Sequence, residues 1–216
     1  MLNKKQLAVV VGMFLVLVSV VVGLSIWQYI ASLHQLKIAN EDNLTFDIQH
    51  VSGEDDNNTD IIATISTSKI ISIKNGKYCA VPTDKQYDQT PECVTINNSD
   101  VSLDLQPSYS DTKLESLLKT QLNTITKTIS SKYGDILDNY IIKPGKLYNR
   151  GEYYATTLTE KTESEAEQGD VYRIILEKKN DTWTVLHYPE LAVNKYDYPS
   201  IPRDILDSVN RLVGYY

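Results

Sequence analysis

The pattern of apolar and polar positions changes twice along the chain, and its first part is strongly apolar. Between Lys5 and His34 there is no charged residue and no histidine, and the stretch from Leu7 to Ile30 consists mostly of Val, Leu, Ile, Gly and Ala. About 20 such residues cross a bilayer as a helix, because every backbone amide is then hydrogen-bonded within the helix. The pattern predicts a transmembrane helix over residues 7–30.

The residues that flank this stretch predict its orientation. Trp27 and Tyr29 lie at its far end, and their amphipathic rings favour the headgroup layer. Lys4 and Lys5 lie at its near end, so the positive-inside bias places residues 1–6 in the cytoplasm and the later domains outside it. A cleaved signal peptide is the alternative, although its apolar core is usually only about 7–15 residues long. We expect an uncleaved single-pass anchor in the plasma membrane, with the lipid bilayer as its partner.

After a stalk expected over residues 31–43, which extends the anchor helix by a turn or two, the apolar period becomes two. Residues 44–51 alternate apolar and polar side chains, and several short β-branched runs follow up to Leu105. Asn75-Gly76 lies between two of these runs and supplies the positive φ angles of a two-residue hairpin turn. We expect a small β-sandwich of about six strands over residues 44–106.

A domain of this size is near the lower limit for a self-sufficient core, which gives the two cysteines a structural reason. Cys79 and Cys93 flank a polar loop, and a bond between them closes a ring of about 15 residues and contributes on the order of 3 kcal/mol. Two free thiols are the alternative, and the Cys-x-x-Cys spacing of a redox pair is absent from the sequence. We predict a disulfide, which the expected exterior location permits.

A helical period begins near Tyr109. From there to Tyr133, leucine and isoleucine recur at intervals of three and four residues and form one apolar stripe. The stripe comprises Leu114, Leu117, Leu118, Leu122, Ile125 and Ile129. Thr112-x-x-Glu115 has the spacing of a capping box, and Gly134 stands where a helix commonly ends. We predict one helix that packs on a sheet.

Three strands and a short helix complete the chain. The strands are predicted over Tyr153–Lys161, Val171–Lys178 and Thr182–Tyr188, where apolar and polar residues alternate. The helix is predicted from Arg203 to Leu212, after the proline-stiffened link that ends at Pro202. The whole chain is therefore predicted to be of the α+β class, with an α+β domain over residues 107–216.

Charge and motifs exclude several functions. The chain has 216 residues and a formal net charge of −7, which argues against binding to nucleic acid. Its three histidines are scattered, and no His-x-x-x-His, Walker or Gly-x-Ser-x-Gly pattern occurs. We predict no catalytic residue, no cofactor and no metal site.

Two further motifs resemble functional sites weakly, and each has a simpler structural interpretation. His187 with Asp181 or Glu190 is a conceivable acid–base pair, but an ordinary strand residue is the simpler interpretation. Asp56-x-Asn58-x-Asp60 matches the start of a calcium loop but lacks the glycine and the glutamate that the motif needs later. We interpret it as a polar turn.

Tyrosine is over-represented relative to phenylalanine. The chain has 15 Tyr and 2 Phe, and tyrosine combines apolar area with a hydroxyl, as recognition surfaces and half-open clefts require. The alternative is that these tyrosines replace phenylalanine in a core with polar edges. The candidates for a partner surface are Tyr153, Tyr172, Tyr188, Tyr196 and Tyr198.

The order of elements over residues 111–213, a helix followed by an antiparallel meander with Tyr and Trp, resembles the cystatin-like or nuclear-transport-factor-like cone fold. The segment Tyr172–Lys178, Trp183, Pro189 and the Tyr198-Pro199-x-Ile201-Pro202 link resemble uncharacterised single-pass exported membrane proteins of candidate-phylum bacteria. This second resemblance implies a membrane topology and no activity.

Together these features predict a membrane-anchored, extracytoplasmic and non-catalytic protein that binds a protein, peptide or glycan at the cell envelope. A structural assembly subunit is the first alternative, since the layout resembles the inner-membrane scaffold subunits of type IV secretion machines apart from the additional β-module. An enzyme directed at the cell wall is the second alternative.

Overall fold

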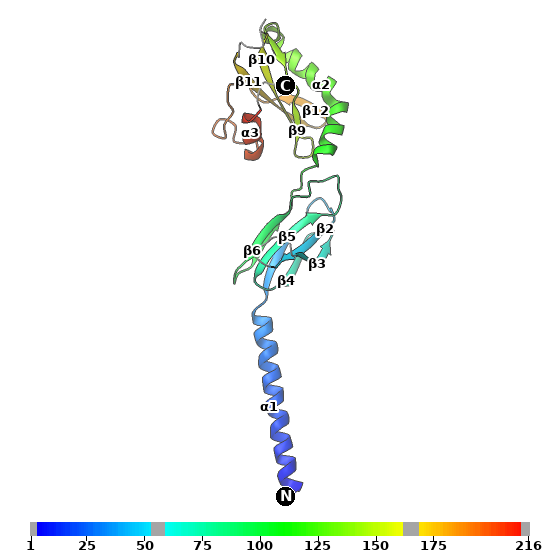
Figure 1. Cartoon of the computed structure of the whole chain (residues 1–216), viewed down its shortest axis with the longest axis vertical. Coiled ribbons are helices and arrows are strands. Elements are labelled where there is room, and N and C mark those ends of the chain that lie inside the picture. Colours follow the sequence, from blue (N-terminus) through cyan, green and yellow to red (C-terminus); the bar gives the residue numbers. More distant parts are fainter. Residues whose placement is uncertain (1–3, 53–58, 162–168, 213–216) are drawn as a thin grey trace. The chain divides into compact units, whose positions relative to one another are not determined.

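The computed structural model describes residues 4–52, 59–161 and 169–212, without the side chains of residues 4–12 and 14–16. The chain forms two compact units (Figure 1). The first comprises Met1–Thr83 and Thr90–Gln106, and the second comprises Asp84–Gln89 and Pro107–Tyr216. Antiparallel sheets, with a long helix packed on the curled sheet of the second unit, confirm the α+β class.

Helix α1 covers Lys4–Ala31 in the first unit. Its described apolar side chains are exposed, and these include the anchor residues Trp27, Tyr29 and Ile30; the side chain of Leu7 lies outside the description. Among the residues that the structure describes, no helix combines the length and the apolar character needed to cross a membrane.

The rest of the first unit contains two sheets. The three-stranded sheet has the order β4-β1-β7, with β1 antiparallel to β4 and parallel to β7. Its strands are β1 (His34–Ala39), β4 (Lys69–Ile73) and β7 (Val101–Asp104). The four-stranded sheet is antiparallel throughout and has the order β3-β2-β5-β6. Its strands are β2 (Phe46–Val51), β3 (Thr59–Ile65), β5 (Gly76–Pro82) and β6 (Glu92–Ile96).

One apolar cluster joins the two sheets. Leu36 and Ile38 of β1 and Phe46 and Ile48 of β2 alternate with more exposed residues and are almost fully buried in it. Alternation along each strand therefore directs one face of each sheet to a shared core.

The helical continuation expected within the stalk of residues 31–43 is wrong, because β1 occupies His34–Ala39 in that range. The chain leaves helix α1 at Ala31 and enters β1 at His34. Leu36 and Ile38 have the period-two spacing of a strand, but a run this short beside a long apolar helix gives a weak sequence signal.

The hairpin expected at Asn75-Gly76 is also wrong. Strand β4, before this turn, pairs with β1, whereas β5, after it, pairs with β2, so the turn carries the chain from one sheet to the other. A β-carbon on Gly76 would lie 2.9 Å from Nε2 of His50, so any larger residue here would have to displace the His50 ring. The side chain of Asn75 accepts a hydrogen bond from the backbone N–H of Asn98 at 2.9 Å.

The predicted disulfide is confirmed. Cys79 of β5 and Cys93 of β6 lie directly opposite each other, and their sulfur atoms are 2.07 Å apart. The neighbours of Cys79 in β5, Tyr78 and Ala80, belong to the shared core, so the bond lies on the outer face of the four-stranded sheet.

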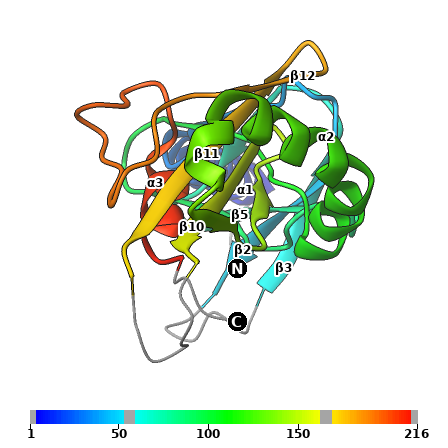
Figure 2. The same cartoon turned by 90° about the horizontal axis from the view of Figure 1, so that it is seen from above.

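The second unit is a sheet between two helices (Figures 1 and 2). The sheet has the order β12-β11-β10-β8, and β9 also pairs with β10. Its strands are β8 (Tyr140–Ile142), β9 (Lys146–Tyr148), β10 (Tyr153–Glu160), β11 (Val171–Lys179) and β12 (Thr182–Val185). The helices are α2 (Asp111–Leu137) and α3 (Arg203–Asn210). The three predicted strands and the last helix are confirmed.

Alternation divides the core of this unit in two. Tyr154 and Leu158 of β10 face α2, where they meet Ile125 and Ile129. Their neighbours on the other face, represented by Ala155, pack with α3. The predicted apolar stripe of α2 thus covers one face of the sheet, and α3 covers the opposite face.

Helix α2 differs from the prediction at both ends. Ser110 caps its start by accepting a hydrogen bond from the backbone N–H of Lys113 at 3.4 Å, in place of the capping box expected at Thr112-x-x-Glu115. The helix continues through Gly134 to Leu137, and it kinks at Tyr133, whose φ and ψ are −129° and 34°. The kink therefore falls at the end predicted for the helix, and a further helical turn follows it.

Candidate functional site

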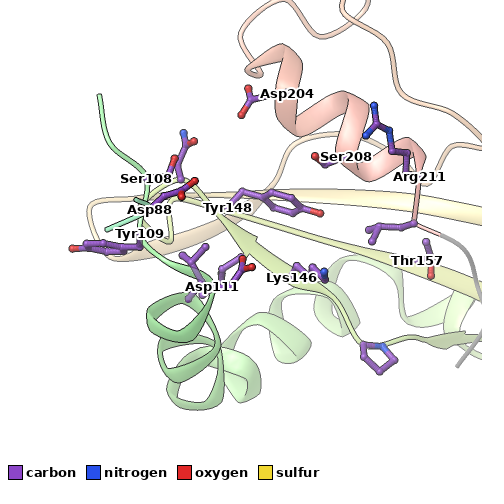
Figure 3. A pocket seen from close by; sticks show the side chains of 15 residues that line it. Asp88, Ser108, Tyr109, Asp111, Lys146, Tyr148, Thr157, Asp204, Ser208 and Arg211 are labelled. Carbon is purple, nitrogen blue, oxygen red and sulfur yellow. The ribbon is translucent and has the colours of Figure 1, made fainter. Parts of the chain in front are cut away.

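A cleft of about 430 Å³ lies in the second unit, between the start of α2, strand β9 and α3 (Figure 3). Its lining is mostly polar, with three aspartates, a lysine, an arginine and two tyrosines. These residues are Asp88, Asp111, Asp204, Lys146, Arg211, Tyr109 and Tyr148.

Strand β9 supplies the floor of the cleft. Lys146, Leu147 and Tyr148 all line it, and Leu147 is also buried in the apolar cluster that includes residues of α2. The strand follows Gly145, where a β-carbon would collide with the carbonyl oxygen of Ala155 and the ring of Tyr154. Only glycine therefore lets β9 lie this close to β10.

The two helices supply the walls. Asp204, Ser208 and Arg211 recur at intervals of four and three residues on α3 and its C-cap, so they share one side of the helix. Asp111 comes from the first turn of α2, where its charge also favours the helix dipole. Asp88 is held by its backbone N–H, which donates to the carbonyl of Ser108 at 2.9 Å.

Charge is unevenly distributed along the cleft. Figure 3 shows Asp88 and Asp111 toward one end and Arg211 toward the other, with the ring of Tyr148 between them. Burial raises the pKa of Tyr148 to about 12, so this phenol is neutral at physiological pH. The cleft therefore offers hydrogen-bond acceptors at one end, donors at the other and an aromatic surface between.

His187, the residue for which an acid–base role was conceivable, lies outside this cleft. It is 6% exposed, and the ring centres of His187 and Tyr198 are 4.7 Å apart. Glu190 accepts a hydrogen bond from the hydroxyl of Tyr198, whereas Asp181 pairs with Lys178 at 3.0 Å at the β11–β12 turn. Burial lowers the pKa of His187 below its usual value.

The five candidate partner-surface tyrosines lie at different places. Tyr153 and Tyr172 belong to opposite faces of the sheet, in the α3 and α2 clusters respectively. Tyr188 and Tyr198 come close to His187, and Tyr188 is 65% exposed. Tyr196 is 95% exposed.

Arg173 is an important residue that sequence reasoning did not single out. Its guanidinium donates hydrogen bonds to five backbone carbonyls, so all five N–H groups are used. The acceptors are Val171, Leu191, Val209, Asn210 and Leu212. Three of them lie at the end of α3 or just beyond it. The signal available in the sequence was one cation within the apolar run of a central strand.

Only part of the calcium-loop match lies among the described residues. Asp56 and Asn58 lie outside the described residues, and Asp60 belongs to β3. Across residues 4–52, 59–161 and 169–212, no group of three or more His, Cys, Asp or Glu side chains is arranged to hold a metal ion.

The fold and the cleft define an α+β protein with a polar, charge-separated cavity on its C-terminal sheet. We compared the chain with models of protein families, with curated protein sequences and with solved structures, and no match was found in any of the three comparisons.

Proposed function

We propose that the protein is a membrane-anchored, extracytoplasmic binding protein that holds a polar ligand, a peptide or a glycan of the cell envelope, in the cleft of its second unit. The single observation that carries this proposal is the composition of the cleft. Three aspartates, a lysine, an arginine and two tyrosines gather there from β9, the segment Asp84–Gln89, α2 with Tyr109 just before it, and α3 with its C-cap.

This lining suits recognition of polar ligands. Tyrosine rings offer flat apolar contact at low entropic cost, and charged groups fix the orientation of a ligand through hydrogen bonds. The exposed Tyr196 and Tyr188 are further candidate contact residues outside the cleft. In this proposal the protein binds its ligand and catalyses no reaction on it.

The anchor is proposed from the sequence. The uncharged run from Gln6 to Leu33 is long enough for a span, and Lys4 and Lys5 precede it. The disulfide Cys79–Cys93 supports an oxidising compartment for the domains that follow. The C-terminal sheet under α2 is interpreted as the cone of cystatin-like and nuclear-transport-factor-like domains, with α3 as an additional layer.

Charge changes in the cleft test the binding proposal. The double variant Asp111→Asn/Arg211→Gln is expected to weaken binding at least tenfold, because each lost charge-assisted hydrogen bond contributes about 1.5–3 kcal/mol. Binding is measured by fluorescence anisotropy of labelled short peptides and oligosaccharides added to the full chain in lipid nanodiscs.

The matched control is Lys119→Gln, which changes an exposed charge of α2 that does not line the cleft. If the wild type and both variants bind every probe with equal affinity, the probes bind outside the cleft. Absence of binding to all peptides and oligosaccharides would reject the proposed function.

A second prediction concerns the anchor. The double variant Val18→Arg/Val21→Arg is expected to lose most of its resistance to extraction by alkaline carbonate, because two cations near the middle of a span oppose insertion by about 5 kcal/mol. Ser32→Arg, just beyond helix α1, is the control and is expected to remain in the membrane pellet. A wild-type chain that alkaline carbonate releases would contradict the anchor.

A further inference from the structure

We propose that His187 makes the α3 wall of the cleft sensitive to pH, because its neutral ring packs on Tyr198 and bonds the carbonyl of Tyr188 within the segment 187–202, and its protonated ring does not fit there. The inference rests on the proposed function only in calling this wall part of a binding site. Its physical basis is a buried imidazole, one of whose ring nitrogens has no hydrogen-bond partner in the described part of the chain.

The hydrogen bonds of His187 define its protonation state. Its Nδ1 lies 2.7 Å from the carbonyl oxygen of Tyr188, so this nitrogen carries the hydrogen and donates it. Nε2 is buried and has no hydrogen-bond partner among the described residues. A proton on Nε2 would therefore be a buried donor without an acceptor, which a folded protein disfavours.

The groups around the ring influence the pKa of His187 in both directions. From α2, Lys132 opposes a positive charge, and the hydroxyl of Tyr133 donates to the carbonyl of His187 at 2.6 Å. From the segment itself, Glu190 favours the charge, but its carboxylate already accepts from the hydroxyl of Tyr198. Burial is the largest influence, so the pKa of His187 is lowered.

The segment that follows His187 leads directly into α3. Val193 and Ile201 are each 1% exposed and pack with α3. The side chain of Asn210, the last residue of α3, donates to the carbonyl of Val193 at 2.6 Å and accepts from its N–H at 3.0 Å. Helix α3 and its C-cap bring Asp204, Ser208 and Arg211 to the cleft, so release of the segment removes part of the packing of this wall and loosens it.

The direction of the effect follows from linkage. The unfolded chain binds a proton at His187 near pH 6.5, and the folded unit binds it only at lower pH. The contribution of His187 to stability is therefore complete above pH 6.5 and declines as the pH falls below it, by up to tenfold in the opening equilibrium for each pH unit.

Hydrogen exchange tests the inference without a ligand, so its outcome is independent of the binding proposal. The full chain in lipid nanodiscs is compared between pH 5 and pH 8, after correction for the intrinsic exchange rates. In the wild type, the opening constant of residues 187–202 and of α3 is expected to rise several-fold to tenfold per pH unit below 6.5.

The variant His187→Phe keeps an aromatic ring beside Tyr198 but cannot titrate, so its opening constant is expected to be independent of pH. His187→Gln serves the same purpose if the phenylalanine variant does not fold. His50→Phe, in the first unit, is the control and is expected to keep the wild-type dependence. The same pH dependence in the His187 variants as in the wild type, or none in the wild type, would overturn the inference.

Discussion

Replacement of Arg173 by methionine is expected to lower the free energy of unfolding of the second unit by about 3 kcal/mol. The guanidinium donates to five backbone carbonyls, three of which lie at the end of α3 or just beyond it. Without these donors the carbonyls lose their partners, and a positive charge no longer complements the negative end of the helix dipole. Urea denaturation at pH 7, followed by circular dichroism, measures the change.

Arg203→Met is the matched control, because Arg203 starts the same helix but its side chain is 83% exposed. Its nearest carboxylate oxygen, on Asp207, is 4.0 Å away. This variant is expected to lose less than about 0.5 kcal/mol, as exposed ion pairs usually contribute little. Arg173→Lys should resemble Arg173→Met, since an ammonium group cannot reproduce the forked geometry. Equal stability of Arg173→Met and wild type would refute the clamp role of Arg173.

Loss of the disulfide is expected to lower the free energy of unfolding of the first unit by a similar amount, about 3 kcal/mol. The bond joins Cys79 and Cys93, 14 positions apart, so the unfolded chain without it gains the freedom of that loop. The variant Cys79→Ala/Cys93→Ala is compared with the wild type by urea denaturation, with and without dithiothreitol.

The reductant provides the control. It should destabilise the wild type toward the level of the double variant and leave the double variant unchanged. A wild-type midpoint that is insensitive to dithiothreitol, or one equal to that of the double variant, would show that the bond contributes nothing measurable.

The parts of the fold that the sequence predicted well are those in which apolar residues repeat at the spacing of a strand or a helix. Strands β10, β11 and β12 and the two helices of the second unit each bury one face, so their apolar residues repeat at the spacing of the element. Asn180 and Asp181, between β11 and β12, have positive φ angles, which asparagine and aspartate tolerate better than most residues. Each of these signals needs only neighbouring residues.

Pairing between distant strands could not be predicted in this way. Asn75-Gly76 has the composition of a hairpin turn, yet its flanking strands enter different sheets. Strands β8 and β9 have three residues each, which is too short for a periodic pattern. The site depends on these features, because Lys146 and Tyr148 of β9 meet residues of α2 and α3 from distant parts of the chain.

Composition and short-range spacing encode the uncharged N-terminal stretch, the α+β class and the pairing of the two cysteines, so these features could be predicted before folding was considered. The folded chain was needed to place β1 within the range expected as a stalk, to bring Arg173 to the end of α3, and to bury His187 with no partner for Nε2 among the described residues. These outcomes depend on which distant backbone groups a side chain meets, and that is set by the packing of whole elements.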